Sequence, residues 1–242
     1  MNRIKENSDG SYRKTAILVG VLFIIGTVSG VLSVVFAGNL LSDPDYLIKF
    51  AENQNQILIS SLCVLIMGIS LAMMSVMLFP ILKKYNEALA LGAVVFRGAL
   101  EAILYIAIVI CWLLLLTVSQ EYVMAGAPAD SQFQTLGTLL LKAVDQTGSI
   151  LDIVFSLGAL MIYYLFYRSK LIPGWLSVWG LLGAVLYLAS GLFTMFGLDF
   201  GFLEAPLALQ EMVLAVWLIV RGFNVYPRIA DAQPVQVAIS RA

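Results

Sequence analysis

Six long apolar stretches, separated by short polar segments, occupy most of the chain. With charged residues and turn formers taken as their limits, they span residues 15–40, 56–82, 88–118, 133–167, 173–196 and 205–222. A helix needs about 20 apolar residues to cross a bilayer. The pattern therefore predicts an all-α, polytopic integral membrane protein with six transmembrane helices. The third and fourth stretches exceed one crossing, so we expect them to tilt or to project from the bilayer.

The same pattern divides the chain into three parts. We expect an N-terminal tail over residues 1–14, a single six-helix transmembrane domain over residues 15–222 and a C-terminal tail over residues 223–242. The C-terminal tail contains two prolines and lacks helical periodicity, so we predict that it is disordered. The first apolar stretch is too long for the hydrophobic part of a cleaved signal peptide, which predicts that the first helix is retained.

The composition of the chain also indicates that most of it is surrounded by lipid. Of the 242 residues, 61% are hydrophobic and 12% are charged, whereas about 25% of the residues in soluble domains are charged. The mean hydropathy is +0.94. We infer that the chain lies largely in the lipid bilayer, and that six spans leave no room for a soluble domain. The net charge of −1 does not indicate a nucleic-acid partner.

The distribution of basic residues predicts which side of the membrane each loop faces. Cytoplasmic loops of membrane proteins are enriched in lysine and arginine. On one side of the bundle the three loops contain Lys49 as their only basic residue. We therefore predict that the opposite side, with both chain termini, is cytoplasmic. The basic residues on that predicted cytoplasmic side are Arg3, Lys5, Arg13, Lys14, Lys83, Lys84, Arg168, Lys170, Arg221, Arg228 and Arg241.

The absence of histidine disfavours several classes of metal and catalytic site. Histidine is the usual axial ligand of haem, a common zinc ligand and the usual base beside a serine or cysteine nucleophile. Haem carriers, zinc proteases of the His-Glu-x-x-His type and Ser-His proteases are therefore disfavoured. Cys63 and Cys111 lie singly inside apolar stretches, and we interpret both as small buried hydrophobic residues. We predict no catalytic residue, no cofactor and no metal site.

Charged residues inside the apolar stretches are the strongest indication of a site. Such a charge costs about 2.5–3.5 kcal/mol at the helix centre even on mild scales, so it faces the bundle interior and needs a partner. Arg97 and Glu101 are four residues apart on one face of the third helix. Glu101 lies roughly 21 Å along its helix from the predicted cytoplasmic end, and Glu211, in the sixth helix, lies roughly 15 Å from its own cytoplasmic end. The two carboxylates are therefore expected at a similar depth in the membrane. We predict that these three residues form a buried polar cluster, with either a binding or a structural role.

A polar stripe follows one face of the fourth helix and is a candidate second element. Its members recur at intervals of three and four residues, as on one helix face. Asp152 is the deepest charge of the stripe, whereas the first two members lie near the outer interface and either pair with each other or reach water. The stripe contains Lys142, Asp145, Ser149, Asp152 and Ser156, and it continues through Ala159 and Tyr163.

The deep charges do not balance. One arginine, Arg97, faces three carboxylates, Glu101, Glu211 and Asp152. Burial disfavours the charged form of a group, so either some carboxyl groups are protonated at neutral pH or a cation occupies the site. The structural alternative is that Arg97 neutralises Glu101 within one helix and that Glu211 accepts a hydrogen bond from a neighbouring helix. Such a hydrogen bond stabilises a helix bundle by less than about 2 kcal/mol.

Four segments carry a resemblance to a known family, namely FRGALEA (96–102), QEMVLAVWLI (210–219), LKKYNEALA (82–90) and WLSVWG (175–180). The chain resembles a bacterial membrane protein family known as domain of unknown function 4386, over roughly residues 12–224. Members commonly have asparagine where this chain has Gln210, which keeps the amide. The resemblance implies a multi-pass protein of the bacterial plasma (inner) membrane and brings no activity.

The residues leave three functions open. The first is a small transporter-like or ion- or proton-responsive protein that uses the cluster of Arg97, Glu101 and Glu211. The second is a non-catalytic structural or accessory protein that binds a protein partner. The third is an intramembrane enzyme acting on a lipid, which the absence of histidine and of an aspartate-rich metal motif disfavours. The pattern specifies neither the ligand, ion or partner nor the oligomeric state.

Overall fold

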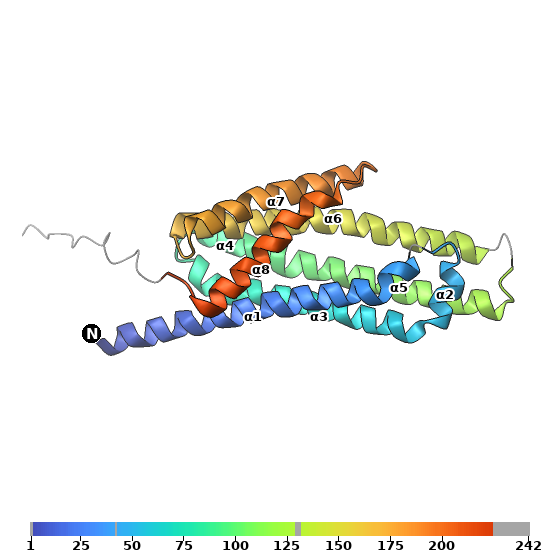
Figure 1. Cartoon of the computed structure of the whole chain (residues 1–242), viewed down its shortest axis with the longest axis horizontal. Coiled ribbons are helices and arrows are strands. Elements are labelled where there is room, and N and C mark those ends of the chain that lie inside the picture. Colours follow the sequence, from blue (N-terminus) through green and yellow to red (C-terminus); the bar gives the residue numbers. More distant parts are fainter. Residues whose placement is uncertain (1, 42, 129–131, 225–242) are drawn as a thin grey trace, which may run out of the picture.

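A computed structural model describes residues 2–41, 43–128 and 132–224 of the chain. Within these ranges every regular element is a helix (Figure 1). Between α4 and α5, the segment η1 is a π-helix, and before α8 the segment η2 is a short 3₁₀-helix. The elements are α1 (Asn2–Leu41), α2 (Tyr46–Glu52), α3 (Gln54–Leu82), α4 (Glu87–Ala93), η1 (Val94–Leu100), α5 (Glu101–Met124), α6 (Gln132–Ser169), α7 (Gly174–Met195), η2 (Gly201–Glu204) and α8 (Ala205–Val220).

Six of these helices are long and apolar enough to cross a membrane, which confirms the predicted fold class. The first, second, fourth and fifth spans are formed by α1, α3, α6 and α7. The third is the continuous helix formed by α4, η1 and α5, and the sixth is η2 followed by α8. The cytoplasmic location of both termini stays a prediction.

Two helices extend beyond their apolar stretches. Helix α1 begins at Asn2 rather than near Thr15, because the segment before Thr15 contains no proline and several good helix formers. Helix α5 ends at Met124 rather than at Val118 for the same reason. Polarity marks the expected edge of the membrane, which need not be the end of a helix. The predicted disordered tail falls mostly on residues 225–242, which lie outside the described residues.

The six spans close into a ring. Each span packs against the next along the chain, and α8 packs back against α1. Figure 1 shows an elongated bundle with α2 at one end and α4 at the other, hereafter the α2 end and the α4 end. By the predicted orientation, the α2 end faces outward and the α4 end faces the cytoplasm. In this order the third span, which contains η1, and the sixth span, α8, are opposite each other.

The helical hairpin of α7 and α8 is shorter than the helix that it covers. Helix α7 has 22 residues and α6 has 38, which correspond to roughly 33 and 57 Å. The turn between α7 and α8 therefore ends before the α2 end is reached (Figure 1). At that end the short helix α2 packs against α5 instead and buries Leu47 and Phe50. The part of α6 between the α7–α8 hairpin and α2 is covered by neither of them, and a cleft forms there.

At the α4 end, Arg13 joins the first span to the last. Its guanidinium Nη2 donates hydrogen bonds to the carbonyl oxygens of Ile219 at 2.8 Å and Val220 at 3.1 Å. These carbonyls belong to the last turn of α8, which has no intrahelical donor for them. A cation at a helix C-terminus also interacts favourably with the helix dipole. Arg13 thus closes the ring at the α4 end.

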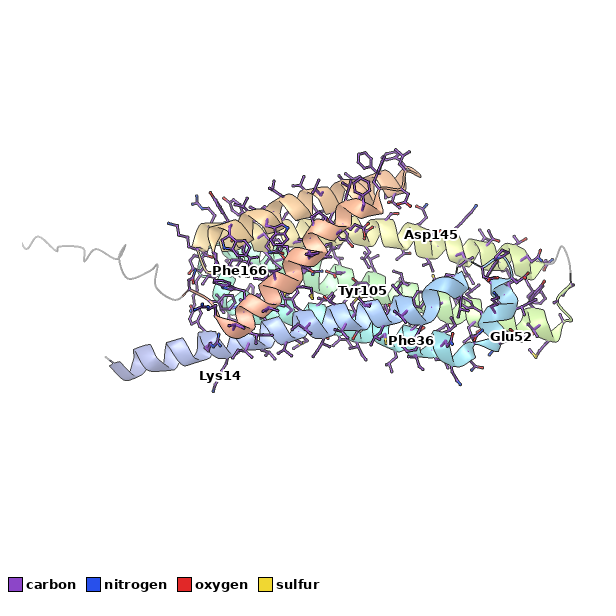
Figure 2. All side chains as sticks on the ribbon, viewed as in Figure 1. Lys14, Phe36, Glu52, Tyr105, Asp145 and Phe166 are labelled. Carbon is purple, nitrogen blue, oxygen red and sulfur yellow. The ribbon has the colours of Figure 1, made fainter. Side chains whose placement is uncertain are left out.

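We expect Arg13→Gln to lower the free energy of unfolding by about 1–2 kcal/mol, because the charged donor to the α8 carbonyls is lost. The measurement is denaturant unfolding of the purified protein in detergent micelles. Lys14→Gln is the matched control, since Lys14 is the next residue, is exposed and points away from the bundle (Figure 2). Equal losses in the two variants would contradict a capping role for Arg13.

Candidate functional site

Arg97 lies in the π-helical segment η1, inside the third span. π-helical turns are rare, and when they interrupt α-helices they occur frequently at functional sites. The Arg97 side chain is only 1% exposed and is the largest fully buried side chain in the described residues. The chain therefore places its most expensive buried charge at a local irregularity of the backbone.

The Arg97 guanidinium bridges two carboxylates. Its Nη1 donates to Glu101 Oε1 at 2.6 Å and its Nη2 donates to Glu211 Oε1 at 2.8 Å. Glu101 is 1% exposed and Glu211 is 8% exposed. Glu101 follows η1 in the same span, whereas Glu211 comes from α8 on the opposite side of the ring. The cluster of Arg97, Glu101 and Glu211 thus spans the interior of the bundle through side chains.

Helix α6 holds Arg97 in place from a third direction. The Arg97 Cζ atom lies 4.0 Å from the centre of the Phe155 ring, which is a cation–π contact. One turn later, α6 approaches η1 so closely that a Cβ atom at Gly158 would lie 2.7 Å from the Arg97 backbone nitrogen. Only glycine permits this approach of two backbones. The guanidinium is therefore fixed by the two carboxylates, an aromatic face and a tight helix contact.

Around the cluster, several buried polar atoms have no hydrogen-bond partner among the described residues. They include Glu101 Oε2, the Tyr163 hydroxyl and Gln210 Oε1, although the Gln210 amide nitrogen donates to the Leu176 carbonyl at 3.0 Å. Tyr105 and Tyr163 lie beside Glu101 and Glu211, respectively. Buried polar atoms without partners are few in native proteins. Of the seven such atoms in the described residues, three lie in or beside the cluster.

The second predicted element lies apart from this cluster. Asp152 is partly buried on α6 and is not one of the ion-pair partners of Arg97; the acidic group near its carboxylate is Glu204, which has the same charge. The hydroxyls of Ser149 and Ser156 are buried and donate to carbonyls of their own helix, those of Asp145 at 3.2 Å and Asp152 at 2.7 Å. The structure therefore keeps these members of the polar stripe apart from the Arg97 cluster, whereas Tyr163, the last member of the stripe, lies beside Glu211.

The outermost members of the stripe are exposed. In the described part of the chain Lys142 and Asp145 form no ion pair with each other, and contact of these side chains with water stays a prediction. The predicted buried cysteines, Cys63 and Cys111, are free and only partly buried. Both lie in helices that expose many apolar side chains at the surface of the bundle, which explains the difference.

A cleft of about 740 Å³ opens beside α6, where the short hairpin of α7 and α8 leaves it uncovered. Its carboxylates are Asp145 and Asp152 from α6, Asp199 from the turn after α7, and Glu204 from η2. Tyr105 also lines the cleft and lies near the middle of the length of the bundle, whereas Asp145 lies on α6 closer to the α2 end (Figure 2). The cleft therefore extends from the outer part of α6 toward the Arg97 cluster.

A family profile described as Domain of unknown function (DUF4386) matches residues 18–222. The chain belongs to the DUF4386 family. This match confirms the resemblance drawn from the four sequence segments. No curated protein and no solved structure matches this DUF4386 protein significantly. Because the family description contains no activity, the function of this DUF4386 protein has to be argued from its cluster and its cleft.

Several residues of the DUF4386 site were not predicted. Phe155 follows Asp152 by three residues and Gly158 follows Phe155 by three, and only this spacing could have placed them on the inner face of α6. The π-helical turn around Arg97 has no sequence signal that we recognise. Apolar and small residues are common in membrane helices, so their contact with a buried charge is visible only in three dimensions.

Proposed function

We propose that this protein is a small transporter-like membrane protein in which the Arg97 cluster responds to a proton or a small cation. The observation that carries the proposal is that one buried guanidinium serves two buried carboxylates from opposite helices of the ring. Ionisable groups within membrane spans commonly mark ion or proton pathways.

The charges of the cluster support a coupled ion. With all three side chains ionised, Arg97, Glu101 and Glu211 have a net charge of −1. An uncompensated charge in a low-dielectric interior is strongly unfavourable. The cluster is neutral when one carboxyl group holds a proton or when a cation joins the site. Binding and release of that one positive charge would then change the attraction between η1 and α8.

Because of its position, a change in the charge of the cluster can change the arrangement of the membrane spans. The third and sixth spans are opposite each other in the ring. The hydrogen bond between Arg97 and Glu211 therefore affects how the two halves of the bundle are positioned relative to each other. A ligand shifts a conformational equilibrium only as far as it binds the two states differently. Here the protonated or cation-bound cluster and the unbound cluster differ in the charge that Arg97 must balance.

The test is thermal unfolding of the detergent-solubilised protein across a pH series and a range of Na⁺ and K⁺ concentrations. If folding takes up one proton at the cluster, stability rises as pH falls, by at most about 1.4 kcal/mol per pH unit. If a cation is taken up instead, the melting temperature rises with its concentration. Either response should disappear in Glu101→Gln and Glu211→Gln, which make the cluster neutral while keeping its shape.

The groups facing the two carboxylates are Arg97, Tyr105 and Tyr163, and the first is a permanent cation, so the response reports on the carboxyl groups. Glu121→Gln, which removes an exposed carboxylate near the end of α5, is the control and should leave the response unchanged. A response that survives both cluster variants would refute the proposal. If the melting temperature of the unmodified protein depends on neither pH nor cation concentration, and a stoichiometric protein partner co-purifies with it, the result would favour an accessory protein.

A further inference from the structure

We propose that protons or small cations reach the Arg97 cluster only from the α2 end, through the cleft beside α6, and that the Tyr105 ring is the barrier between this cleft and Glu101. This inference rests on the proposed function and names the access route to the same site. A transporter exposes its site to one side of the membrane at a time. Two observations support the route, namely the different packing of the two ends of the bundle and the position of Tyr105 between them.

The cleft lies inside the ring of spans, because all six spans contribute to its lining. Along α6 it extends over residues 144–152, the part of the helix nearer the α2 end. Gly148 and Gly197 line it, and a Cβ atom at either would meet no described atom within 4 Å. The interior of the bundle is therefore loosely filled on this side. The six spans contribute, among others, Ser33, Met67, Tyr105, Gly148, Thr194 and Glu204.

Nearer the α4 end, the interior is filled by close contacts between helices. A Cβ atom at Gly20 of α1 would lie 2.6 Å from the Ala215 carbonyl oxygen of α8. A Cβ atom at Gly92 of α4 would lie 2.7 Å from the Met161 sulfur of α6. Interiors that are packed so tightly contain few voids large enough for water. The α4 end therefore offers no comparable passage among the described residues.

The chain after α8 also closes the α4 end. Phe223 is 6% exposed, and its ring centre lies 6.2 Å from that of Phe166 on α6. The side-chain amide and the backbone nitrogen of Asn224 donate to the carbonyls of Lys170 and Leu171, at 3.1 and 2.7 Å. These two carbonyls belong to the turn between α6 and α7. An ion that entered from this end would have to break these contacts.

Tyr105 lies where the two packing regions meet. It lines the cleft, and it packs against buried apolar residues on both sides of the middle of the bundle. Figure 2 shows it between Phe166 and Asp145 along the length of the bundle. It follows Glu101 by one helical turn on the same face and lies beside it. Glu101 is 1% exposed, so the Tyr105 ring separates its carboxylate from the cleft.

An unpaired charge indicates that the cleft contains water. Asp152 lines the cleft and forms no ion pair within residues 2–41, 43–128 and 132–224. Ionisable side chains in membrane spans face the bundle interior or a water-filled cavity, because lipid does not solvate them. Water in the cleft would solvate this carboxylate. The negative charge of the cleft would also attract protons and cations rather than anions.

The experiment is cysteine labelling in sealed vesicles of uniform orientation, with a membrane-impermeant cationic methanethiosulfonate. Cys63 and Cys111 are first replaced by alanine. A thiol reacts as its thiolate, which forms in water and not in lipid. Gly148→Cys lines the cleft, whereas Ile150→Cys lies on the exposed apolar surface of the same helix. We therefore expect Gly148→Cys to react at least about tenfold faster than Ile150→Cys.

Two exposed reporter positions identify the side from which the reagent arrives. Glu52→Cys reports the α2 end (Figure 2), and Lys83→Cys, in the turn between α3 and α4, reports the α4 end. Gly148→Cys should react from the same side of the membrane as Glu52→Cys. The inference is overturned if Gly148→Cys reacts from the side of Lys83→Cys, or if it reacts no faster than Ile150→Cys.

The barrier is tested with a cysteine behind Tyr105. Glu101→Cys should react slowly in the presence of Tyr105 and at least about tenfold faster in the background of Tyr105→Ala. Tyr105→Phe is the matched control, since it keeps the ring and should leave the rate unchanged. Ile162→Cys, which replaces a residue that is 2% exposed on α6, should stay unreactive in the Tyr105→Ala background. Tyr105 is not the barrier if Tyr105→Ala leaves the rate at Glu101→Cys unchanged, or if it speeds the reaction at Ile162→Cys equally.

The two proposals fail separately. If Gly148→Cys does not react, while a pH or cation response still depends on Glu101 and Glu211, the access route is refuted and the proposed function stands. If the cysteines react as expected but the cluster shows no response, the proposed function is refuted, and with it the passage of ions to the cluster.

Discussion

Replacing Arg97 with methionine should lower the free energy of unfolding by about 3–5 kcal/mol, because two buried carboxylates then lose their common counter-charge. Methionine has a similar length and retains contact with the Phe155 ring, so the lost interaction is mainly the charge. The measurement is denaturant unfolding in micelles. Removal of one partner of a buried pair is more harmful than removal of the whole pair, since it leaves an uncompensated charge.

The triple variant Arg97→Met, Glu101→Gln, Glu211→Gln therefore tests the cause. It keeps the volume of the cluster and removes every charge, so we expect it to recover most of the stability that Arg97→Met loses. If the triple variant is as unstable as the single variant, the loss comes from packing around Arg97 rather than from the carboxylates. If Arg97→Met causes no loss, the two carboxylates do not depend on the guanidinium.

Gly158→Ala should destabilise the protein by about 2–3 kcal/mol, at the upper end of what overpacking costs. The new Cβ atom would lie 2.7 Å from the Arg97 backbone nitrogen and 2.8 Å from Arg97 Cβ. Neither atom belongs to the flexible end of a side chain, so relief requires α6 and η1 to separate. That separation would also move Phe155 away from the guanidinium. The unfolding free energy and the pH response of the variant can be measured together.

Gly148→Ala on the same helix is the matched control. A Cβ atom there would meet nothing within 4 Å, and alanine is a better helix former than glycine by up to about 1 kcal/mol. We expect this control to be neutral or slightly stabilising. A similar loss of stability in the two variants would show that the effect is a general property of glycine in α6 and would contradict a specific contact with Arg97.

The number of spans follows directly from the order of residues. In a bilayer every backbone polar group must be satisfied within its own segment, so a stretch of about 20 apolar residues has few alternatives to a helix. This is why the six spans were predicted. The ends of the helices were predicted less well, since Asn2–Lys14 and Ser119–Met124 continue helices through segments with many polar residues, which no bilayer constraint can reveal.

The candidate residues of the cluster were also visible in the order of residues, because a charge inside an apolar span is costly and stands out. Arg97 and Glu101 share a helix face by their spacing alone. That Glu211 meets them, whereas Asp152 does not, depends on the closure of the ring and on the rotation of each helix about its axis. Neither quantity is encoded in local periodicity.

The cleft and the supports of Arg97 belong wholly to the assembled bundle. The lengths of α6 and α7 could be compared from the sequence, but the cleft arises from where the turn after α7 ends relative to α2, α5 and α6. Phe155 and Gly158 have no distinctive local pattern, and their roles come from one close approach between α6 and η1. Hydrophobicity dictates which segments enter the membrane, while the packing of small and charged side chains between helices dictates which of them meet.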